Sequence, residues 1–301
     1  MSLPGPVVVI GGVNVDVVAE PSGPPVPAVS NPGRVRIGPG GAGRNVAENL
    51  ARLGLSVRLI AAADAHPLTT VSLAEAARAG VDTSGVIRIH GRGNYYVAVE
   101  HAGALLWAVS DMSAAEALAP SDLDERAWLL KDAGAVVVDA NLQPATIVRA
   151  ADLAGGTRLC LLAVSAAKAE RLRPVLPRAS LIACGVPEAA ALTGLEIRSR
   201  GDAARAARRL RPEGGTVLIT MGPQGLGWFG AEEVWVDAPP VAVRDPTGAG
   251  DAAAAAAVYA LLTGMEAKAG AGLAMAAAAM TLEVEGATHP GLSLEALRGR
   301  R

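Results

Sequence analysis

A run of turn-forming residues, Asp245-Pro246-Thr247-Gly248-Ala249-Gly250-Asp251, leads directly into a stretch of helix formers, Ala252–Leu262. A glycine turn that feeds a helix start aims free backbone N–H groups and the positive end of the helix dipole at one point. Such a point suits a phosphate or a developing oxyanion. Asp251 stands at this start, where a carboxylate can either cap the helix or accept a proton from a substrate hydroxyl. An anion hole beside a carboxylate base is the minimum equipment for phosphoryl transfer to an alcohol.

The composition is that of a globular α/β protein. The 301 residues are 51% hydrophobic and 19% charged, which is enough for a substantial core. The net charge of −2 gives no sign of a nucleic acid or an anionic membrane as a partner. Cys160 and Cys184 follow no metal-binding spacing and are expected to be buried thiols in a reducing compartment. Apolar stretches such as Ala269–Leu282 are too short to span a membrane, and no basic signal region precedes Val7–Ile10, so we expect a cytoplasmic protein.

Apolar runs alternate with helical patterns along most of the chain. Val7–Ile10 is a continuous apolar run that ends at Gly11-Gly12, as expected of a strand buried on both faces. Alternating strands and helices predict a mostly parallel sheet with helices on both faces. The other predicted strands are Val57–Ala61, Val136–Val138, Leu159–Ala163, Leu181–Ala183 and Val217–Thr220, followed by a hairpin of Gly225–Phe229 and Glu233–Val236. The predicted helices are Asn45–Leu53, Val71–Ala79, Thr146–Leu153, Ala166–Leu172, Glu188–Thr193 and Asp202–Leu210, with two alanine-rich helices near the end.

Two further segments are expected to lie outside the main sheet. The β-rich runs Tyr95–Val99 and Ala104–Val109 flank His101-Ala102-Gly103 and predict a hairpin. The segment Pro21–Pro32, rich in Pro, Ser and Gly, predicts an excursion away from the core. No repeat and no long linker divides the chain. We therefore expect one domain, residues 1–301, with a small antiparallel β lid contributed by about residues 13–40 and 88–110.

A second glycine-rich segment, Gly38–Gly43, formally matches the G-x-G-x-x-G dinucleotide fingerprint. Asp64, 21 residues after Gly43, stands where the ribose-binding acid is expected. Against this alternative, the preceding strand Val35–Ile37 is short and alternates with arginines, as in a half-exposed edge strand. The fingerprint also leaves Asp245–Asp251 unexplained. A P-loop ATPase is excluded because no GxxxxGK[ST] motif occurs, so a nucleotide would be held by backbone amides, helix dipoles, Mg²⁺ and arginine.

Three segments in this order resemble the signatures of the ribokinase-like (PfkB) carbohydrate and nucleoside kinases. They are Gly40-Gly41-x-x-x-Asn45, Val81–Val86 and Thr247–Asp251, and the resemblance extends over the whole chain, including the two-part lid. Within the family, Ser30–Val35, Gly40–Leu50 and Ala108–Met112 are most similar to the pseudouridine kinases. The resemblance implies a ribokinase-like α/β fold and an ATP-dependent kinase.

The resemblance also implies roles for individual residues. Asp251 would be the catalytic base, with Gly248, Ala249 and Gly250 forming the anion hole. The acceptor would be bound by a set of polar and glycine residues, namely Asn14, Asp16, Gly41, Asn45 and Asn141. ATP would be bound by Thr220, Gly222 and Gly225, and its phosphates by Gly248 and Gly250. Glu188 would help to hold Mg²⁺, and Asp245 and Thr247 would begin a loop for a monovalent cation, usually potassium.

Several of these residues also have ordinary structural interpretations. Asn14 and Asp16 follow a strand and can be turn formers. Asn45 can merely begin its helix, and Thr220 can be an ordinary sheet residue. These alternatives stay open at the level of sequence.

The chain departs from the family pattern in three places. In the usual Asn-x-x-Glu, Gly185 replaces the Asn, although Glu188 remains. Ala62–His66 lacks the usual run of glycine and aspartate, and Ala163-Val164 replaces a common Asp-Pro. These losses affect the residues that organise Mg²⁺, so we expect an active enzyme that needs a higher Mg²⁺ concentration.

We therefore expect transfer of the γ-phosphoryl group of ATP to the 5′-hydroxyl of a ribonucleoside, with pseudouridine as the first candidate. Ribose, adenosine or fructose stay open as acceptors. A catalytically weakened sugar-binding protein and a dinucleotide-binding oxidoreductase also stay open as alternative functions. Apolar side chains on the lid, Tyr95, Val97, Leu105 and Trp107, predict a homodimer through this surface.

Overall fold

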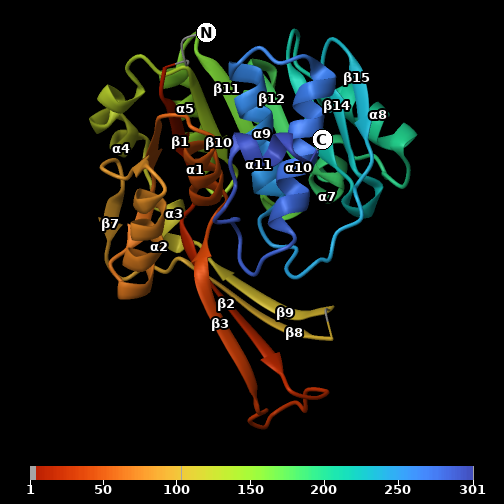
Figure 1. The fold of residues 1–301 in the computed structure, drawn as a ribbon. Helices are drawn as coiled ribbons and strands as arrows, with labels where there is room; N and C mark the ends of the chain where they lie inside the picture. Colours follow the sequence, from red (N-terminus) through yellow and green to blue (C-terminus); the bar gives the residue numbers. More distant parts are fainter. Residues whose placement is uncertain (1–4, 103, 301) are drawn as a thin grey trace.

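The computed structural model describes residues 5–102 and 104–300, which form a nine-stranded sheet between two layers of helices and a smaller sheet that projects from it (Figure 1). The strand order is β15-β14-β13-β12-β11-β10-β1-β4-β6. All neighbours from β6 to β13 are parallel, and the pairs β13–β14 and β14–β15 are antiparallel. The strands are β1 (Val7–Ile10), β4 (Val57–Ile60), β6 (Val81–Asp82), β10 (Ala135–Asp139), β11 (Arg158–Leu162), β12 (Leu181–Gly185), β13 (Thr216–Thr220), β14 (Leu226–Phe229) and β15 (Glu233–Val236).

The sheet is buried on both faces, as its continuous apolar strands predict. Val7 and Val9 of β1 belong to one core cluster, and Val8 and Ile10 belong to the other. The first cluster includes residues of α1 (Ala42–Arg52), α2 (Pro67–Arg78), α9 (Ala249–Leu262), α10 (Ala267–Thr281) and α11 (Leu294–Arg298). The second includes residues of α4 (Pro120–Glu125), α5 (Pro144–Ala154), α6 (Ala166–Ala169), α7 (Val186–Thr193) and α8 (Arg200–Leu210). The predicted three-layer α/β architecture is confirmed.

The alanine-rich helices α9 and α10 pack closely against each other. A Cβ atom placed on Gly270 of α10 would lie 3.0 Å from the Cβ of Ala260 on α9. The residues Ala252–Ala257 are buried almost completely. Small side chains therefore let α9 lie deep in the core, with its N-terminus at the carboxyl end of the parallel strands.

A four-stranded sheet in the order β3-β2-β8-β9 projects from the main body (Figure 1). It is built from β2 (Asn14–Pro21), β3 (Gly33–Gly40), β8 (Tyr95–His101) and β9 (Ala104–Asp111). The pairs β2–β3 and β8–β9 are antiparallel hairpins, and β2 and β8 join them through a parallel pairing. The predicted hairpin is confirmed, with Gly103 of its loop outside the described residues. The predicted excursion Pro21–Pro32 connects β2 and β3 at the far end of the projecting arm (Figure 1).

The position of β3 removes the basis for the dinucleotide fingerprint. Val35–Ile37 pairs with β2 at the edge of the small sheet, so no central parallel strand leads into Gly38–Gly43. Asp64 ends β5 (Ala62–Asp64), which pairs with β7 (Ile87–Ile89), and its Oδ2 accepts a hydrogen bond from the Tyr95 hydroxyl at 2.9 Å. Asp64 thus anchors the base of the small sheet.

One predicted helix begins earlier than expected. The pattern predicts a helix from Val71, and α2 begins at Pro67. Nδ1 of His66 accepts a hydrogen bond from the Leu68 N–H at 3.2 Å, so a histidine serves as the cap and proline occupies the first turn.

A second predicted helix, Ala166–Leu172, ends earlier than expected. The α-helix α6 stops at Ala169, and Glu170–Arg178 continues as a 3₁₀-helix, η2. Pro174 and Pro177 lie inside η2 and lack the N–H groups that an α-helix would need there.

Short elements complete the chain. They are α3 (Ser113–Glu116) and two 3₁₀-helices, η1 (Ala127–Leu130) and η3 (Gly222–Gln224). Among the described residues, none of the helices combines the length and the apolar character needed to span a bilayer.

Candidate active site

The N-terminus of α9 is open toward the carboxyl end of the sheet. Its N-cap is Gly248, which has φ 77° and makes no side-chain capping hydrogen bond. A Cβ on Gly248 would collide with the carbonyl oxygen of Ala287, so only glycine allows this close approach. Gly248, Ala249 and Gly250 therefore present backbone N–H groups at the positive end of the α9 dipole, an arrangement suited to an anion.

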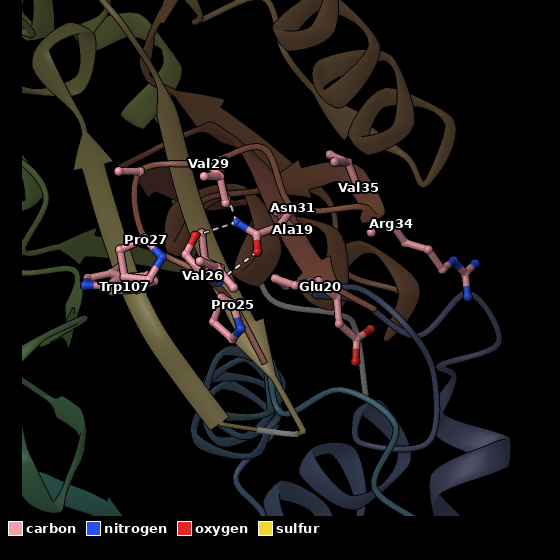
Figure 2. A pocket seen from close by; sticks show the side chains of 14 residues that line it. Ala19, Glu20, Pro25, Val26, Pro27, Val29, Asn31, Arg34, Val35 and Trp107 are labelled. Atoms are coloured by element: carbon pink, nitrogen blue, oxygen red, sulfur yellow. Dashed lines mark hydrogen bonds between the residues drawn. The ribbon is translucent and has the colours of Figure 1, made fainter. Parts of the chain in front are cut away.

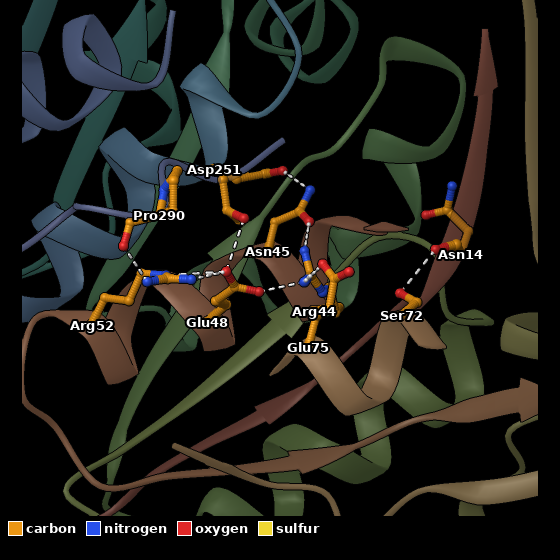
Figure 3. A network of polar contacts seen from close by, with 10 residues as sticks. Asn14, Arg44, Asn45, Glu48, Arg52, Ser72, Glu75, Asp251 and Pro290 are labelled. Atoms are coloured by element: carbon orange, nitrogen blue, oxygen red, sulfur yellow. Dashed lines mark hydrogen bonds and ion pairs between the residues drawn. The ribbon is translucent and has the colours of Figure 1, made fainter. Parts of the chain in front are cut away.

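Asp251 lies in the first turn of α9 and is half-buried. Its Oδ2 accepts a hydrogen bond from Nδ2 of Asn45 at 2.8 Å (Figure 3). Burial raises the pKa of Asp251 to about 7, the Asn45 donor opposes this, and the negative charges of Asp139 and Asp16 raise the pKa further. A carboxyl group with a pKa near neutrality is suited to accept a proton from an alcohol.

The first glycine cluster lies directly beside this carboxylate. Gly41 is the N-cap of α1 with φ 100°, and a Cβ there would come within 2.5 Å of the Gly12 carbonyl oxygen. A Cβ on Gly43 would lie 2.9 Å from backbone atoms of Gly11. These glycines let the start of α1 pack onto the turn after β1. As a result, Asn45 on α1 reaches Asp251 on α9, across 206 residues of sequence.

Asp139, at the end of β10, is a buried acidic residue that the motif analysis missed. Its Oδ2 accepts hydrogen bonds from the N–H groups of Gly12 at 2.7 Å and Gly43 at 2.9 Å. Its Oδ1 accepts one from the Asn141 N–H at 2.9 Å. Burial raises the pKa of Asp139, and these donors oppose the rise. The sequence feature that could have identified Asp139 is its place at the carboxyl end of a predicted parallel strand, two residues before Asn141.

Asn141 is buried and its side chain is held on both sides. Nδ2 donates to Oδ2 of Asp139 at 3.2 Å, and Oδ1 accepts from Nζ of Lys168 at 2.9 Å. Burial lowers the pKa of Lys168, while the negative charge of Asp139 raises it. Arg171 donates to the Asn141 carbonyl oxygen at 3.0 Å. Lys168 and Arg171 thus bring positive charge to this part of the site. No sequence motif predicted a role for these two residues.

Asn14 and Asp16, on β2, form a second polar pair. Nδ2 of Asn14 donates to Oδ1 of Asp16 at 2.5 Å. Burial raises the pKa of Asp16 to about 6, although the Asn14 hydrogen bond and the charge of Arg44 lower it. A Cβ on Gly40 would collide with this carboxylate, so Gly40 leaves room for it. Asp16 also borders a cavity of about 650 Å³ between the small sheet and the main body, together with Tyr96, Glu100 and Leu105.

Of the residues predicted for the nucleotide, Thr220, Gly222 and Gly250 border two neighbouring cavities. Thr220 and Gly185 contribute to both: a small one of about 150 Å³, which Glu188, Gly250 and Asp251 also border, and a larger one of about 410 Å³. Gly222 borders the larger cavity. Gly225 borders neither and has a structural role, since its carbonyl oxygen accepts the Met221 N–H at 2.8 Å and its φ is 92°.

Glu188 caps its own helix. Its Oε2 accepts the Gly185 N–H at 2.8 Å, and a Cβ on residue 185 would lie 2.7 Å from this oxygen. A side chain at position 185 would crowd the Glu188 carboxylate in this position. Nearby, Val164 borders the small cavity with φ 61°, a strained conformation for a β-branched residue. Among the described residues, no group of three or more His, Cys, Asp or Glu side chains is placed to hold a metal ion.

Asp245 is buried beside the large cavity and its carboxylate has several partners. Oδ1 accepts the Thr247 N–H at 2.9 Å, and Oδ2 accepts the Gly286 N–H at 3.1 Å. Arg36 of β3 also donates to Oδ2 at 3.2 Å. Burial acts to raise the pKa of Asp245, but the donors from Thr247, Gly286 and Arg36 outweigh it and lower the pKa.

The fold and this arrangement agree with the comparisons to known proteins. The chain belongs to the pfkB family of carbohydrate kinases, because the sequence model of that family matches residues 6–293. It is 28% identical over 293 residues to the pseudouridine kinase of Escherichia coli (strain K12), covering 96% of this chain and 94% of the relative. It is 30% identical over 253 residues to the guanosine-inosine kinase of Exiguobacterium acetylicum, covering 81% of this chain and 84% of that protein.

A solved structure confirms the ribokinase-like fold. The Arabidopsis thaliana ribokinase complexed with ribose and ATP superimposes with a TM-score of 0.84 at 21% identity, covering 98% of this chain and 99% of that one. Membership of this kinase family excludes the dinucleotide-binding oxidoreductase that Gly38–Gly43 had suggested.

Proposed function

We propose that this protein is an ATP-dependent kinase that phosphorylates the 5′-hydroxyl of a ribonucleoside, with pseudouridine as the expected acceptor. The observation that carries the proposal is the hydrogen bond between Asn45 and Asp251, because it joins the two glycine-rich helix starts at one place. An acceptor hydroxyl at that place would meet a base and a set of anion-binding N–H groups together. Similarity to pseudouridine kinase and guanosine-inosine kinase supports a nucleoside as the acceptor.

In the proposed reaction, the acceptor oxygen bonds to the γ-phosphorus of ATP, Asp251 accepts the hydroxyl proton, and the bond from the γ-phosphorus to the bridging oxygen breaks to release ADP. The N–H groups of Gly248, Ala249 and Gly250 stabilise the charge on the transferred phosphoryl group. Asn14, Asp16, Gly41, Asn45 and Asn141 orient the acceptor, since their donors and acceptors match the hydroxyl groups of a ribose. Asp139 supports this set indirectly by holding Gly12 and Gly43.

We propose that ATP lies along the two cavities that share Thr220. The adenosine part would occupy the larger cavity beside Gly222, and the phosphates would extend past Gly250 toward Asp251. Gly225 would then act through the shape of its turn. Lys168 lies on the same side as Asn141 and would add positive charge near the reacting groups.

The residues present fit a Mg²⁺ ion bound mainly through water and phosphate. Mg²⁺ keeps several waters and needs only one or two carboxylates from a protein. Glu188 borders the small cavity and would hold the ion, which supplies charge neutralisation on the phosphates when bound. Because Glu188 is also engaged with the Gly185 N–H, we expect a higher Mg²⁺ requirement. A Mg²⁺ titration of activity that reaches half-maximum at ordinary concentrations would contradict this expectation.

The residues predicted for a potassium ion do not fit it well. Asp245 and Thr247 carry that prediction, but the Arg36 guanidinium already pairs with the Asp245 carboxylate. A cation at Oδ2 would have to displace Arg36 or share the carboxylate with it. We therefore derive no catalytic step from potassium and expect little dependence of the rate on it.

We propose that the small sheet acts as a lid on a single domain of residues 1–301. Tyr96, Glu100 and Leu105 border the 650 Å³ cavity from the lid, while Pro246 and Thr247 border it from the main body. This cavity would receive the nucleobase, and closure would exclude water from the reaction. The same cavity can accept a different sugar or nucleoside, so ribose, adenosine and fructose remain alternative acceptors.

We propose a homodimer through the outer face of the small sheet. Val35, Trp107 and Val109 are 59–68% exposed there. The loop after β2 curves over this face and encloses a hollow of about 510 Å³ beside Trp107 (Figure 2). Leu105, included in the sequence-based prediction, borders the inner cavity instead. Sedimentation of the wild type and of Val109→Asp tests this proposal, and a monomeric wild type would refute it.

We also propose that the protein works in the cytoplasm, where ATP is abundant and where the buried free thiols Cys160 and Cys184 would stay reduced. The decisive assay couples ADP release to an optical signal with ATP, Mg²⁺ and a panel of acceptors from pseudouridine to ribose. Fastest turnover with pseudouridine supports the proposal. Turnover with a different compound of the panel, and not with pseudouridine, would identify that compound as the acceptor. Binding without any ATP-dependent turnover would favour a sugar-binding protein.

A further inference from the structure

A buried arginine stands next to the residue that contacts the proposed base. Arg44 and Glu48 lie on consecutive turns of α1 and are 0% and 2% exposed. Their side chains form an ion pair in the core (Figure 3). Burying two charges removes their hydration at a cost that their attraction repays only with good geometry and further hydrogen bonds, so this pair calls for an explanation.

Arg44 contacts the oxygen end of the Asn45 amide, and Asp251 contacts the nitrogen end. NH1 of Arg44 donates to Oδ1 of Asn45 at 3.2 Å. A guanidinium can only donate hydrogen bonds, so it holds the amide oxygen on its own side. Nδ2 of Asn45 therefore faces Asp251, where it donates at 2.8 Å. In the flipped orientation, the amide oxygen would face a carboxylate oxygen, and Asp251 would lose its donor.

Glu48 keeps Arg44 in place and is itself fixed from outside the helix. Oε1 of Glu48 accepts hydrogen bonds from the Thr288 hydroxyl at 2.9 Å and from NH2 of Arg52 at 2.9 Å. Arg52 also donates to the Pro290 carbonyl oxygen (Figure 3). Thr288 directly follows Ala287, whose carbonyl oxygen packs against Gly248 at the start of α9. The same segment thus supports the predicted anion hole and the Arg44–Glu48 pair.

We propose that Arg44 is a positioning residue, which orients the Asn45 amide so that its N–H₂ group serves the carboxylate of Asp251. The inference rests on the proposed kinase function for its catalytic consequence, but the orientation itself follows from the contacts of α1 alone.

The charges around Asp251 show why this donor matters. Asp16 on β2 and Asp139 on β10 both raise the pKa of Asp251, and Glu188 borders the same small cavity. The Asn45 hydrogen bond is the contribution that lowers it. Arg44 also lowers the pKa of Asp16 through its charge. With the amide flipped, more negative charge would act on Asp251 with no opposing donor, and its proton would be held more tightly.

The test uses the double variant Arg44→Met/Glu48→Gln, which removes both charges of the buried pair together, so that Oε2 of Glu48 is not left as a buried charge without Arg44. With the fold checked by circular dichroism, we expect kcat to fall about tenfold at neutral pH and the acid limb of the kcat profile to move up by about one pH unit. The KM for the acceptor should change much less. Arg44→Lys keeps a donor-only head group, so it should recover part of the lost rate and part of the shift.

A second background separates positioning from a general structural effect. In Asn45→Ala, the amide is absent, so adding Arg44→Met/Glu48→Gln should produce no further shift of the acid limb. A full additional shift in that background would overturn the proposal, as would an unshifted limb in the folded double variant.

The proposal can fail independently of the kinase function. The pKa of the Asp251 carboxyl group can be followed through the ¹³C NMR chemical shift of its carboxyl carbon. Asp251→Asn is used to assign that signal. An upward shift in Arg44→Met/Glu48→Gln supports the positioning role even if no acceptor is turned over, and an unchanged pKa refutes it.

Discussion

The guanidinium of Arg36 lies 3.2 Å from Oδ2 of Asp245, and this contact joins the small sheet to the loop that precedes α9. Arg36 is on β3, 209 residues before its partner. The ion pair therefore connects the proposed lid to the loop that leads into the proposed anion hole. It is partly exposed on the Arg36 side, so it is worth at most about 1 kcal/mol.

Removing this ion pair should weaken acceptor binding more than chemistry. In Arg36→Gln, the lid loses one of its attachments, so we expect the acceptor KM to rise about fivefold, the factor that corresponds to about 1 kcal/mol, while kcat changes little. Arg34→Gln on the same strand is the matched control and should leave both constants near their wild-type values. We also expect potassium to stimulate Arg36→Gln more than the wild type, because a cation can then reach Asp245. Equal potassium responses in the two proteins would argue against a role for Arg36 at this site.

Asp251→Asn should abolish most of the activity without preventing binding. An amide cannot accept the hydroxyl proton, so kcat should fall by about 10²–10⁴. Isothermal titration with the acceptor measures whether binding is kept. Turnover close to wild type in a correctly folded Asp251→Asn protein would remove the general-base role.

The rate should depend on pH through the same carboxyl group. Because the pKa of Asp251 is about 7, kcat should decline as the pH falls below neutrality. The charge of Asp16 raises this pKa, so Asp16→Asn should move the acid limb to lower pH even though it weakens acceptor binding. A limb that stays in place or moves upward in Asp16→Asn would contradict the electrostatic account.

Folding stability should show the opposite preference for pH. The pKa of Asp251 is raised from 3.8 in the unfolded chain to about 7 in the folded protein. The folded state thus binds this proton more tightly, and the stability that it contributes below pH 3.8 is lost as the pH rises through about 7. Asp251→Asn has no such charge, so its Tm should exceed that of the wild type most clearly at alkaline pH. Thermal melts at pH 5 and pH 8 that give the same difference in Tm would disprove this.

The two glycines of the α9 start should respond differently to alanine. At Gly248, φ is 77° and a Cβ would meet the Ala287 carbonyl, so Gly248→Ala should destabilise the fold by about 1–3 kcal/mol and displace the helix start. At Gly250, nothing lies within 4 Å of an added Cβ, so Gly250→Ala should fold normally. Urea unfolding of both variants makes the comparison, and equal stability would show that the Gly248 contact is relaxed in solution.

Patterns of neighbouring residues were sufficient to predict a mostly parallel sheet with helices on both faces, and the family resemblance added the ribokinase-like fold. Val7–Ile10 is a four-residue apolar run, and such runs are buried on both faces in a parallel sheet. The start of α9 and the cluster Gly40–Gly43 were also visible, because a helix start and a glycine turn are local features. That the two would meet was not visible from spacing and came from the family resemblance.

Other parts of the candidate site depend on contacts between distant residues. Asp139 accepts the Gly12 N–H across 127 residues, and no local pattern marks it. Lys168 contacts Asn141, and Arg44 contacts Asn45. Without these contacts, a charged residue in a helical pattern is predicted to be solvent-exposed. The 3₁₀-helix at Glu170–Arg178 differs from the prediction for a local reason, because two prolines override a helical pattern.

The hydrogen bonds from Gly12 and Gly43 to Asp139 have a consequence for how this enzyme could change its acceptor. The floor of the proposed acceptor site is made of main chain hydrogen-bonded to a buried acid, and substitutions there would disturb the packing of β1 against α1. New preferences would therefore have to arise on the opposite wall, where Tyr96, Glu100 and Leu105 can vary without touching the core. Engineering or natural divergence of selectivity should concentrate on those side chains.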